Sequence, residues 1–135
     1  MNTPNRYLVY LLYFILTIPV VILLFKFIEP RKLASLFAAT LFITCSLLPL
    51  WGEIRNKTKS TFVFWTSIGF LILFSAPMII VRIINYDVDF SSINFGPISG
   101  PEFHKYSNYG FIILLTSTIV DYFQTRRSTV ANQKR

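Results

Sequence analysis

Four long stretches without a charged residue divide the sequence, and they predict its helices. The first three contain 19, 20 and 22 residues, and a helix needs about 20 apolar residues to cross a bilayer. The fourth has 15 residues before Asp121, and extending it to Thr125 adds one charge and gives 20. We therefore expect four membrane-spanning helices, at about 7–27, 33–52, 60–84 and 106–125.

These spans predict an all-α membrane protein, a single domain over 1–135 built as an up-down-up-down four-transmembrane-helix bundle. A folded extracytoplasmic loop at 85–105 would join the third and fourth helices, and 126–135 would form a cytoplasmic tail. The first stretch is longer than the apolar core of a signal peptide, roughly 7–15 residues, and Lys26 and Glu29 follow it closely. We expect it to stay as a helix.

Composition supports a membrane and argues against a nucleic-acid partner. Hydrophobic residues make up 53% of the 135 residues, more apolar surface than a soluble domain of this size can bury. The net charge is +7, but the basic residues flank the apolar stretches, where they would face anionic lipid. A nucleic-acid-binding protein would gather them on one face of a soluble fold. The lipid bilayer is therefore the expected surrounding.

The distribution of Lys and Arg predicts the orientation, because cytoplasmic loops carry an excess of both. With the N-terminus inside, eight basic residues lie on the inner side and five on the outer side. The inner set is Arg6, Arg55, Lys57, Lys59, Arg126, Arg127, Lys134 and Arg135, and the outer set is Lys26, Arg31, Lys32, Arg82 and Lys105. This bias favours both termini in the cytoplasm of a bacterial cell, with the helices in its inner membrane.

Small residues mark the surfaces at which helices would meet. Because lipid provides no hydrophobic drive between helices, close packing of small side chains must hold them together. The expected packing positions are Ala34, Ser35, Ala38, Ala39, Cys45 and Ser46 on the second helix, and Gly69 and Ala76 on the third. These could contact helices of the same chain or of a partner. Cys45 is the single cysteine, which excludes an internal disulfide.

Three spans contain an interior proline: Pro19, Pro49 and Pro77. Each proline removes a backbone hydrogen bond to the carbonyl four residues earlier. We expect kinks that shape the bundle, with a hinge in a permeation path as the alternative.

The fourth span carries a polar stripe formed by Gly110, Ser117, Asp121 and Gln124. Asp121 is the only carboxylate within the four expected spans, and an ionisable group in a membrane suggests proton or cation coupling. It also lies near basic residues at the inner interface, so a structural tether is the competing interpretation. Arg82 lies at the outer end of the third span. Its side chain could extend to the interface or pair with Asp87 or Asp89, and an anion-binding role is a further possibility.

The expected loop at 85–105 is rich in apolar residues and contains two Gly-Pro steps, which favour turns. We expect it to fold against the outer surface and to contact a partner through Asp87, Asp89, Phe90, Phe95, Glu102 and His104. The acidic residues and His104 could also form an acid–base site. His104 is the only histidine, which excludes a multi-histidine zinc site, so we predict no metal and no cofactor.

In size, basic charge and number of spans the chain resembles the membrane immunity proteins that protect bacteria from pore-forming toxins. No motif carries this resemblance. Small multidrug exporters have a glutamate in their first span, and the first span here has no charge. The sequence favours a non-enzymatic accessory, assembly or immunity-type protein that binds a membrane-protein partner or a second copy. The alternatives are a small oligomeric transporter using Asp121 and a membrane enzyme using the outer loop.

Overall fold

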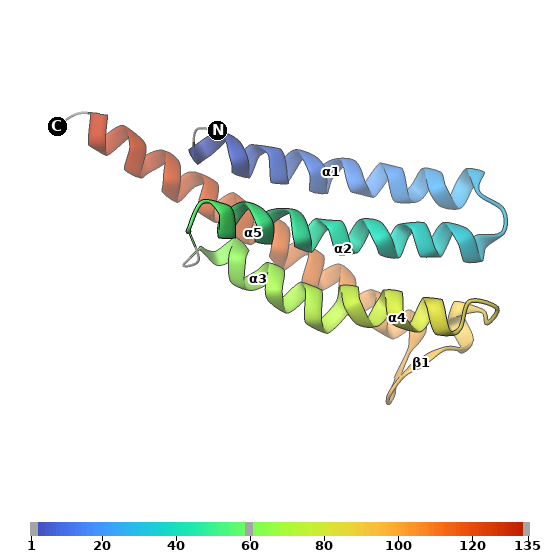
Figure 1. Ribbon diagram of the computed structural model, residues 1–135. Helices are drawn as coiled ribbons and strands as arrows, with labels where there is room; N and C mark the ends of the chain where they lie inside the picture. The colour runs from blue at the N-terminus through green and yellow to red at the C-terminus, as the bar shows by residue number, and fades with distance from the viewer. Residues whose placement is uncertain (1–2, 59–60, 134–135) are drawn as a thin grey trace.

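The computed structural model describes residues 3–58 and 61–133, and these are almost entirely helical (Figure 1). Residues 62–84 form one long, unbroken helical rod, in which a π-helical turn at 71–75 joins two α-helical segments. Short elements η2, β1 and β2 lie between this rod and the last helix. The elements are α1 (Thr3–Phe27), α2 (Arg31–Arg55), α3 (Phe62–Phe70), η1 (Leu71–Ser75), α4 (Ala76–Ile84), η2 (Phe90–Ser92), β1 (Asn94–Phe95), β2 (Ile98–Ser99) and α5 (Gly100–Gln133).

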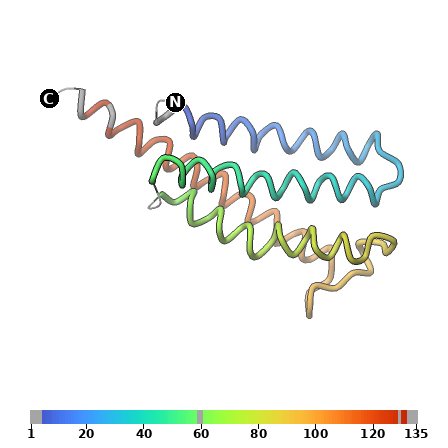
Figure 2. The backbone as a smooth tube through the Cα atoms, in the orientation of Figure 1, coloured from blue at the N-terminus to red at the C-terminus, as the bar shows by residue number. Residues whose placement is uncertain are grey.

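The chain runs back and forth, so both termini lie at the same end of the bundle (Figures 1 and 2). We call this the termini end, and it includes the turn between α2 and α3. The opposite end, with the α1–α2 turn and residues 85–99, is the loop end. Helix α1 packs on α2 and α5, and α3 packs on the same two helices. Helix α5 crosses the bundle obliquely (Figures 1 and 2): it contacts η1, η2 and the two strands towards the loop end, and α1 and α3 elsewhere.

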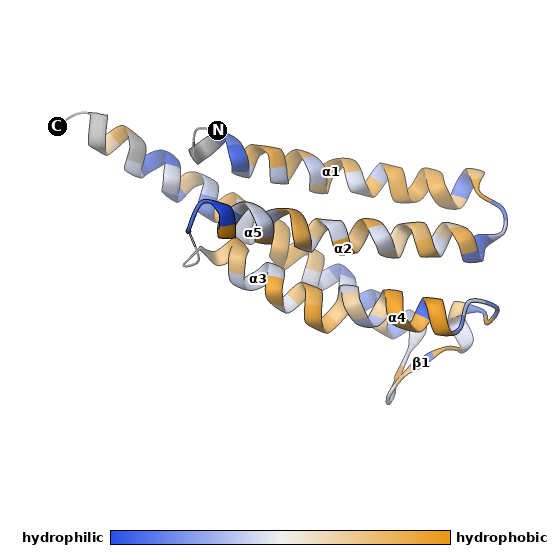
Figure 3. Ribbon diagram, in the orientation of Figure 1, coloured by the Kyte–Doolittle hydropathy of each residue, from blue (hydrophilic) through white to orange (hydrophobic). Residues whose placement is uncertain are grey.

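Within the described residues, three helices are long and apolar enough to cross a membrane: Asn5–Phe27, Arg31–Arg55 and Phe62–Ile84. Many large apolar side chains of these helices are exposed, such as Ile22 and Ile72. Hydrophobic residues occur along most of the length of each helix (Figure 3). These helices are compatible with a membrane protein. Helix α5 is a fourth, less apolar helix, and its membrane crossing stays a prediction.

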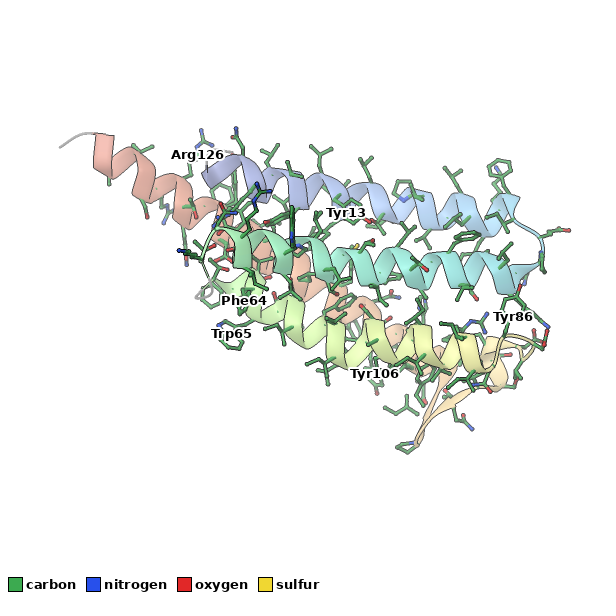
Figure 4. The ribbon with its side chains drawn as sticks, in the orientation of Figure 1. Tyr13, Phe64, Trp65, Tyr86, Tyr106 and Arg126 are labelled. Atoms are coloured by element: carbon green, nitrogen blue, oxygen red, sulfur yellow. The ribbon has the colours of Figure 1, made fainter. Side chains whose placement is uncertain are left out.

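Aromatic rings form the centre of the bundle. Phe111 of α5 contacts Phe14 of α1, Phe42 of α2 and Phe70 of α3, with ring centroids 5.7 to 6.2 Å apart. Such ring pairs contribute about 0.5–1.5 kcal/mol each beyond the burial of their surface. This cluster therefore joins all four antiparallel rods. Nearer the outside, Tyr13 lies between α1 and α2, where its hydroxyl bonds to that of Thr44 (Figure 4).

Pro77 shapes the third rod through the π-helical turn that precedes it. Proline has no N–H to donate to the carbonyl of Leu73, four residues earlier. Just before it, the N–H of Ala76 donates to the carbonyl of Leu71, five residues back, which is the π-helical pattern. The hydroxyl of Ser75, in the same turn, donates to the carbonyl of Phe42 at 3.2 Å. The effect of this proline is therefore a π-helical turn joined to α2.

The first two helices are longer than predicted, and the last helix differs from the sequence prediction at both ends. Helix α5 begins at Gly100 instead of 106, so Glu102 and His104 lie on a helix and not in a loop. The side chain of Glu102 accepts hydrogen bonds from the N–H and the hydroxyl of Ser99, which is half of a capping box. Helix α5 also continues to Gln133, so the expected tail is helical as far as the structure describes it. Lys59, Ser60, Lys134 and Arg135 lie outside the described residues.

The small residues of α2 face the interior of the chain. Ala34, Ala38, Ala39, Cys45 and Ser46 are all buried. The Ser46 hydroxyl lies 3.3 Å from that of Ser75, and the Cys45 sulfur lies 3.5 Å from the Thr17 hydroxyl. Ser35 and Ala76 are half-buried, as is Gly69. Most of the expected packing surface of α2 is thus used within the chain.

Two glycines in helices, Gly69 and Gly110, should respond differently to replacement by alanine. A Cβ at Gly110 would lie 2.7 Å and 2.8 Å from carbons of the Phe74 ring, whereas one at Gly69 would meet nothing within 4 Å. We expect Gly110→Ala to cost about 1–3 kcal/mol through overpacking. Gly69→Ala should be neutral or stabilising, because alanine favours a helix by up to about 1 kcal/mol. Thermal melting of the two variants in one detergent checks this, and equal melting temperatures would contradict the close packing of Gly110 on Phe74 of η1.

Candidate binding pocket

A buried ion pair joins α1 to α2 at the termini end. The Nε atom of Arg6 lies 3.1 Å from Oε1 of Glu53, and the two side chains are 5% and 0% exposed. Arg6 also donates from Nη2 to Oε2 of Glu53 at 3.3 Å and to the hydroxyl of Tyr7 at 2.8 Å. A buried charge needs such compensation, because removing an ion from water costs several kcal/mol.

Hydroxyl groups complete the surroundings of Glu53. Thr58 and Thr61, from the turn between α2 and α3, donate to its Oε2 at 2.6 Å and 3.0 Å, and Tyr7 does so at 3.4 Å. Glu53 thus binds the start of α1 and the α2–α3 turn to the end of α2. The expectation that Asp121 is the only carboxylate within a span is wrong, because α2 extends to Arg55 and includes Glu53.

Asp121 caps helix α3. It is buried, and its Oδ2 accepts a hydrogen bond of 2.6 Å from the N–H of Val63, in the first turn of that helix. The first N–H groups of a helix have no partner within it, and the helix dipole favours a negative charge there. The contact therefore accounts physically for a carboxylate inside the bundle.

The rest of the polar stripe divides between the interior and the surface. Ser117 hydrogen-bonds with Thr66 of α3 at 2.7 Å, and Gly110 lies against Phe70 and Phe74 of the same rod. Gln124 is exposed. Three of the four stripe positions thus form the contact between α5 and the α3–α4 rod.

A second buried arginine lies at the loop end, on α4. Arg82 is 5% exposed. Its Nε donates to the hydroxyl of Ser35 on α2 at 2.7 Å, and Nη2 bonds to the same oxygen. Nη1 donates to the carbonyl of Val88 at 3.4 Å, and the guanidinium lies 5.4 Å from the centre of the Phe90 ring. No carboxylate of the described residues lies within 4.0 Å of it.

Arg82 lines a partly open cavity of about 740 Å³ between α1, α2, α4, η2 and the start of α5. Cavities that bind small molecules measure about 300–1,000 Å³. We call this cavity the loop-end pocket. Its lining is mainly apolar, with polar groups at one side, and it consists of Val21, Ile22, Phe25, Arg31, Lys32, Ser35, Ala38, Ala39, Phe42, Met78, Arg82, Asp89, Phe90, Ser91 and His104.

The charged groups of the lining are mostly cations. The lining contains three basic residues, Arg31, Lys32 and Arg82, and one acidic residue, Asp89. Lys32 donates to the carbonyl of Asp87 at 2.7 Å and lies 3.6 Å from its carboxylate, which is 92% exposed, so solvent weakens this pair. Desolvation lowers the pKa of His104 below its usual value of 6.5. The lining therefore carries an excess of positive charge.

The loop residues expected to contact a partner do not form one continuous cluster in the structure. The rings of Phe95 and Phe103 stack, with centroids 3.9 Å apart, and Phe90 contacts Phe95 and His104. These aromatic contacts fix residues 90–95 on α5. Asp87 is at the surface and Glu102 caps α5. Within 3–58 and 61–133, no group of three His, Cys, Asp or Glu residues is arranged to hold a metal ion.

Neither the role of Glu53 nor the pocket is predicted by the sequence. Glu53 ends the second uncharged stretch, and an acidic residue so close to a span was the available signal. The pocket had none, because its lining comes from segments far apart in the sequence. That the outer-loop residues and the small residues of α2 and the third rod bind a partner remains a prediction. Comparison of the chain with protein-family models, with characterised proteins and with solved structures finds no match.

Breaking the Arg6–Glu53 pair should destabilise the protein strongly. Glu53→Gln leaves the Arg6 charge buried and unpaired, and we expect a loss of about 3–5 kcal/mol. Replacing both residues with methionine should recover most of that loss, because no buried charge remains. Thermal melting of the single and double variants checks this, with the exposed Arg127→Gln as control. Additive losses in the double variant would contradict the coupling.

Asp121 should affect stability through its capping contact. Asp121→Ala leaves the Val63 N–H buried without an acceptor, and we expect it to lower stability by about 1–3 kcal/mol. Asp121→Asn keeps an acceptor oxygen and should cost less. Melting curves of both variants decide the matter, and an alanine variant as stable as the wild type would show that the cap does not contribute.

Proposed function

We propose that this chain is a non-enzymatic membrane protein that acts by binding, and that the loop-end pocket is its binding site. The observation that carries the proposal is the cavity of about 740 Å³, with an apolar lining and a buried arginine at one side. Binding pockets combine mostly apolar walls with a few polar groups that orient the ligand. The lining of this pocket has that composition.

In the proposal all four rods cross the membrane, with both termini in the cytoplasm of a bacterial cell. Support comes from the exposed apolar surface of the three longest apolar helices and from the excess of basic residues at the termini end. The loop-end pocket then lies near the outer surface, and its apolar walls are within reach of lipid. A hydrophobic ligand could enter it from the bilayer.

The contacts of the polar residues favour binding over transport or catalysis. Asp121, the residue on which a transporter would depend, holds the first turn of α3. The hydroxyl of Ser35 is bonded to Arg82, and His104 contacts the Phe90 ring. A partner protein or a second copy stays part of the proposal. Because the small residues of α2 are buried, such a partner would contact the outward faces instead.

Filling the pocket should abolish binding without unfolding the protein. Ala39 lines the pocket and is buried, and phenylalanine at this position would occupy part of the cavity. We expect native mass spectrometry of wild-type protein in mild detergent to detect a retained small molecule of defined mass. Ala39→Phe should lose it. Ile72→Phe, at an exposed apolar position, is the matched control and should keep it.

Melting curves show whether each variant is folded, and Met78→Phe is a second pocket variant in case Ala39→Phe does not fold. Absence of any retained molecule from the wild-type protein would refute the proposal. So would equal retention by the pocket variants and the control.

A further inference from the structure

The loop-end pocket is amphiphilic along its length. On α2 the lining begins with Arg31, Lys32 and Ser35 near the loop end, and continues deeper with apolar residues as far as Phe42. At a rise of 1.5 Å per residue, this series covers about 16 Å. Helix α4 repeats the order, since Arg82 is nearer the loop end than Met78. The polar groups are thus gathered at one end of an apolar cavity.

Arg82 differs from Arg6 in how its charge is compensated. Arg6 lies beside the Glu53 carboxylate, whereas Arg82 bonds only to a hydroxyl and a carbonyl and contacts a ring. Neutral acceptors satisfy N–H groups, but they neutralise no charge. A guanidinium has five N–H donors in a planar fork that suits carboxylate and phosphate oxygens. Arg82 is therefore a nearly buried cation in the pocket lining, and no described carboxylate pairs with it.

Neighbouring charges strengthen the preference for an anion. Arg31 and Lys32 line the same end of the pocket, and Asp89 is the one acidic residue of the lining. The lining thus contains three cationic side chains and one carboxylate. Burial increases the attraction between Arg82 and an anion, whereas Arg31 is exposed and Lys32 is half-buried, so their contributions are smaller.

We propose that the loop-end pocket binds an anionic amphiphile. Its phosphate or carboxylate group lies at Arg82, at the end of the pocket that Arg31 and Lys32 also line, and its hydrocarbon chain lies along Ile22, Phe42 and the other apolar lining residues. This inference rests on the proposed function and names the class of ligand. A free anion would leave the apolar walls uncovered, and a neutral lipid would bring no anionic group to Arg82, whose nearest acidic influence is Asp89, farther than 4.0 Å away.

Three probes separate the contributions of head and chain. We would measure the binding of a lysophosphatidic acid, of the monoacylglycerol with the same chain, and of inorganic phosphate to the wild-type protein. Native mass spectrometry at constant concentration of a neutral detergent provides the readout. We expect the lysophosphatidic acid to bind at least tenfold more tightly than the monoacylglycerol, and phosphate alone to compete weakly.

The role of Arg82 is tested by a matched pair of variants. Arg82→Gln should reduce the affinity for the lysophosphatidic acid about tenfold or more and leave that for the monoacylglycerol unchanged. Arg126→Gln, at an exposed site of the termini end, should change neither (Figure 4). Lys32→Gln should cause a smaller loss of the same kind, and it serves if Arg82→Gln does not fold.

The outcomes distinguish the two proposals. Equal affinities for the lysophosphatidic acid and the monoacylglycerol would refute the proposal that the ligand is anionic. The proposal that the pocket is a binding site would still hold. Full competition by inorganic phosphate would indicate a site for the anion alone, which also overturns the amphiphile. If neither amphiphile shows saturable binding that Ala39→Phe abolishes, the proposed function itself fails.

Discussion

The need to compensate a buried charge governs this structure at both ends. At the termini end, Arg6 is matched by Glu53, and the same carboxylate holds the α2–α3 turn through Thr58 and Thr61. This junction joins α1 to α2 at the end where α5 also packs against α1. At the loop end Arg82 is equally buried, but it has no described carboxylate within 4.0 Å. The two ends therefore differ in whether the chain provides the counterion.

The oblique course of α5 explains why the pocket lies where it does. Phe111 joins α5 to Phe14 of α1 near the middle of the bundle. Towards the loop end α5 moves away from α1 (Figures 1 and 2) and contacts η1, η2 and the two strands. His104 is the one residue of α5 in the lining, whereas α1 contributes Val21, Ile22 and Phe25. The packing that closes the termini end is thus absent between α1 and α5 at the loop end.

The sequence predicted those features that depend on a single continuous segment of the chain. Uncharged stretches of about 20 residues predicted the three apolar helices, because length and composition suffice for them. The start of α5 was missed because Ser99 and Glu102 were interpreted as loop residues, although their spacing is that of a capping box. The partners of Glu53 and Arg82 depend on contacts between distant segments. Periodicity along one sequence contains no information about such contacts.

An experimental structure of the protein in lipid nanodiscs prepared from its own membranes tests the central claim most directly. The account predicts an elongated ligand in the loop-end pocket, with its acidic group within hydrogen-bonding distance of the Arg82 guanidinium. Its chain should lie against Phe42 and Met78. A collapsed pocket in which the Asp89 carboxylate pairs with Arg82 would contradict the account, because the chain would then provide its own counterion.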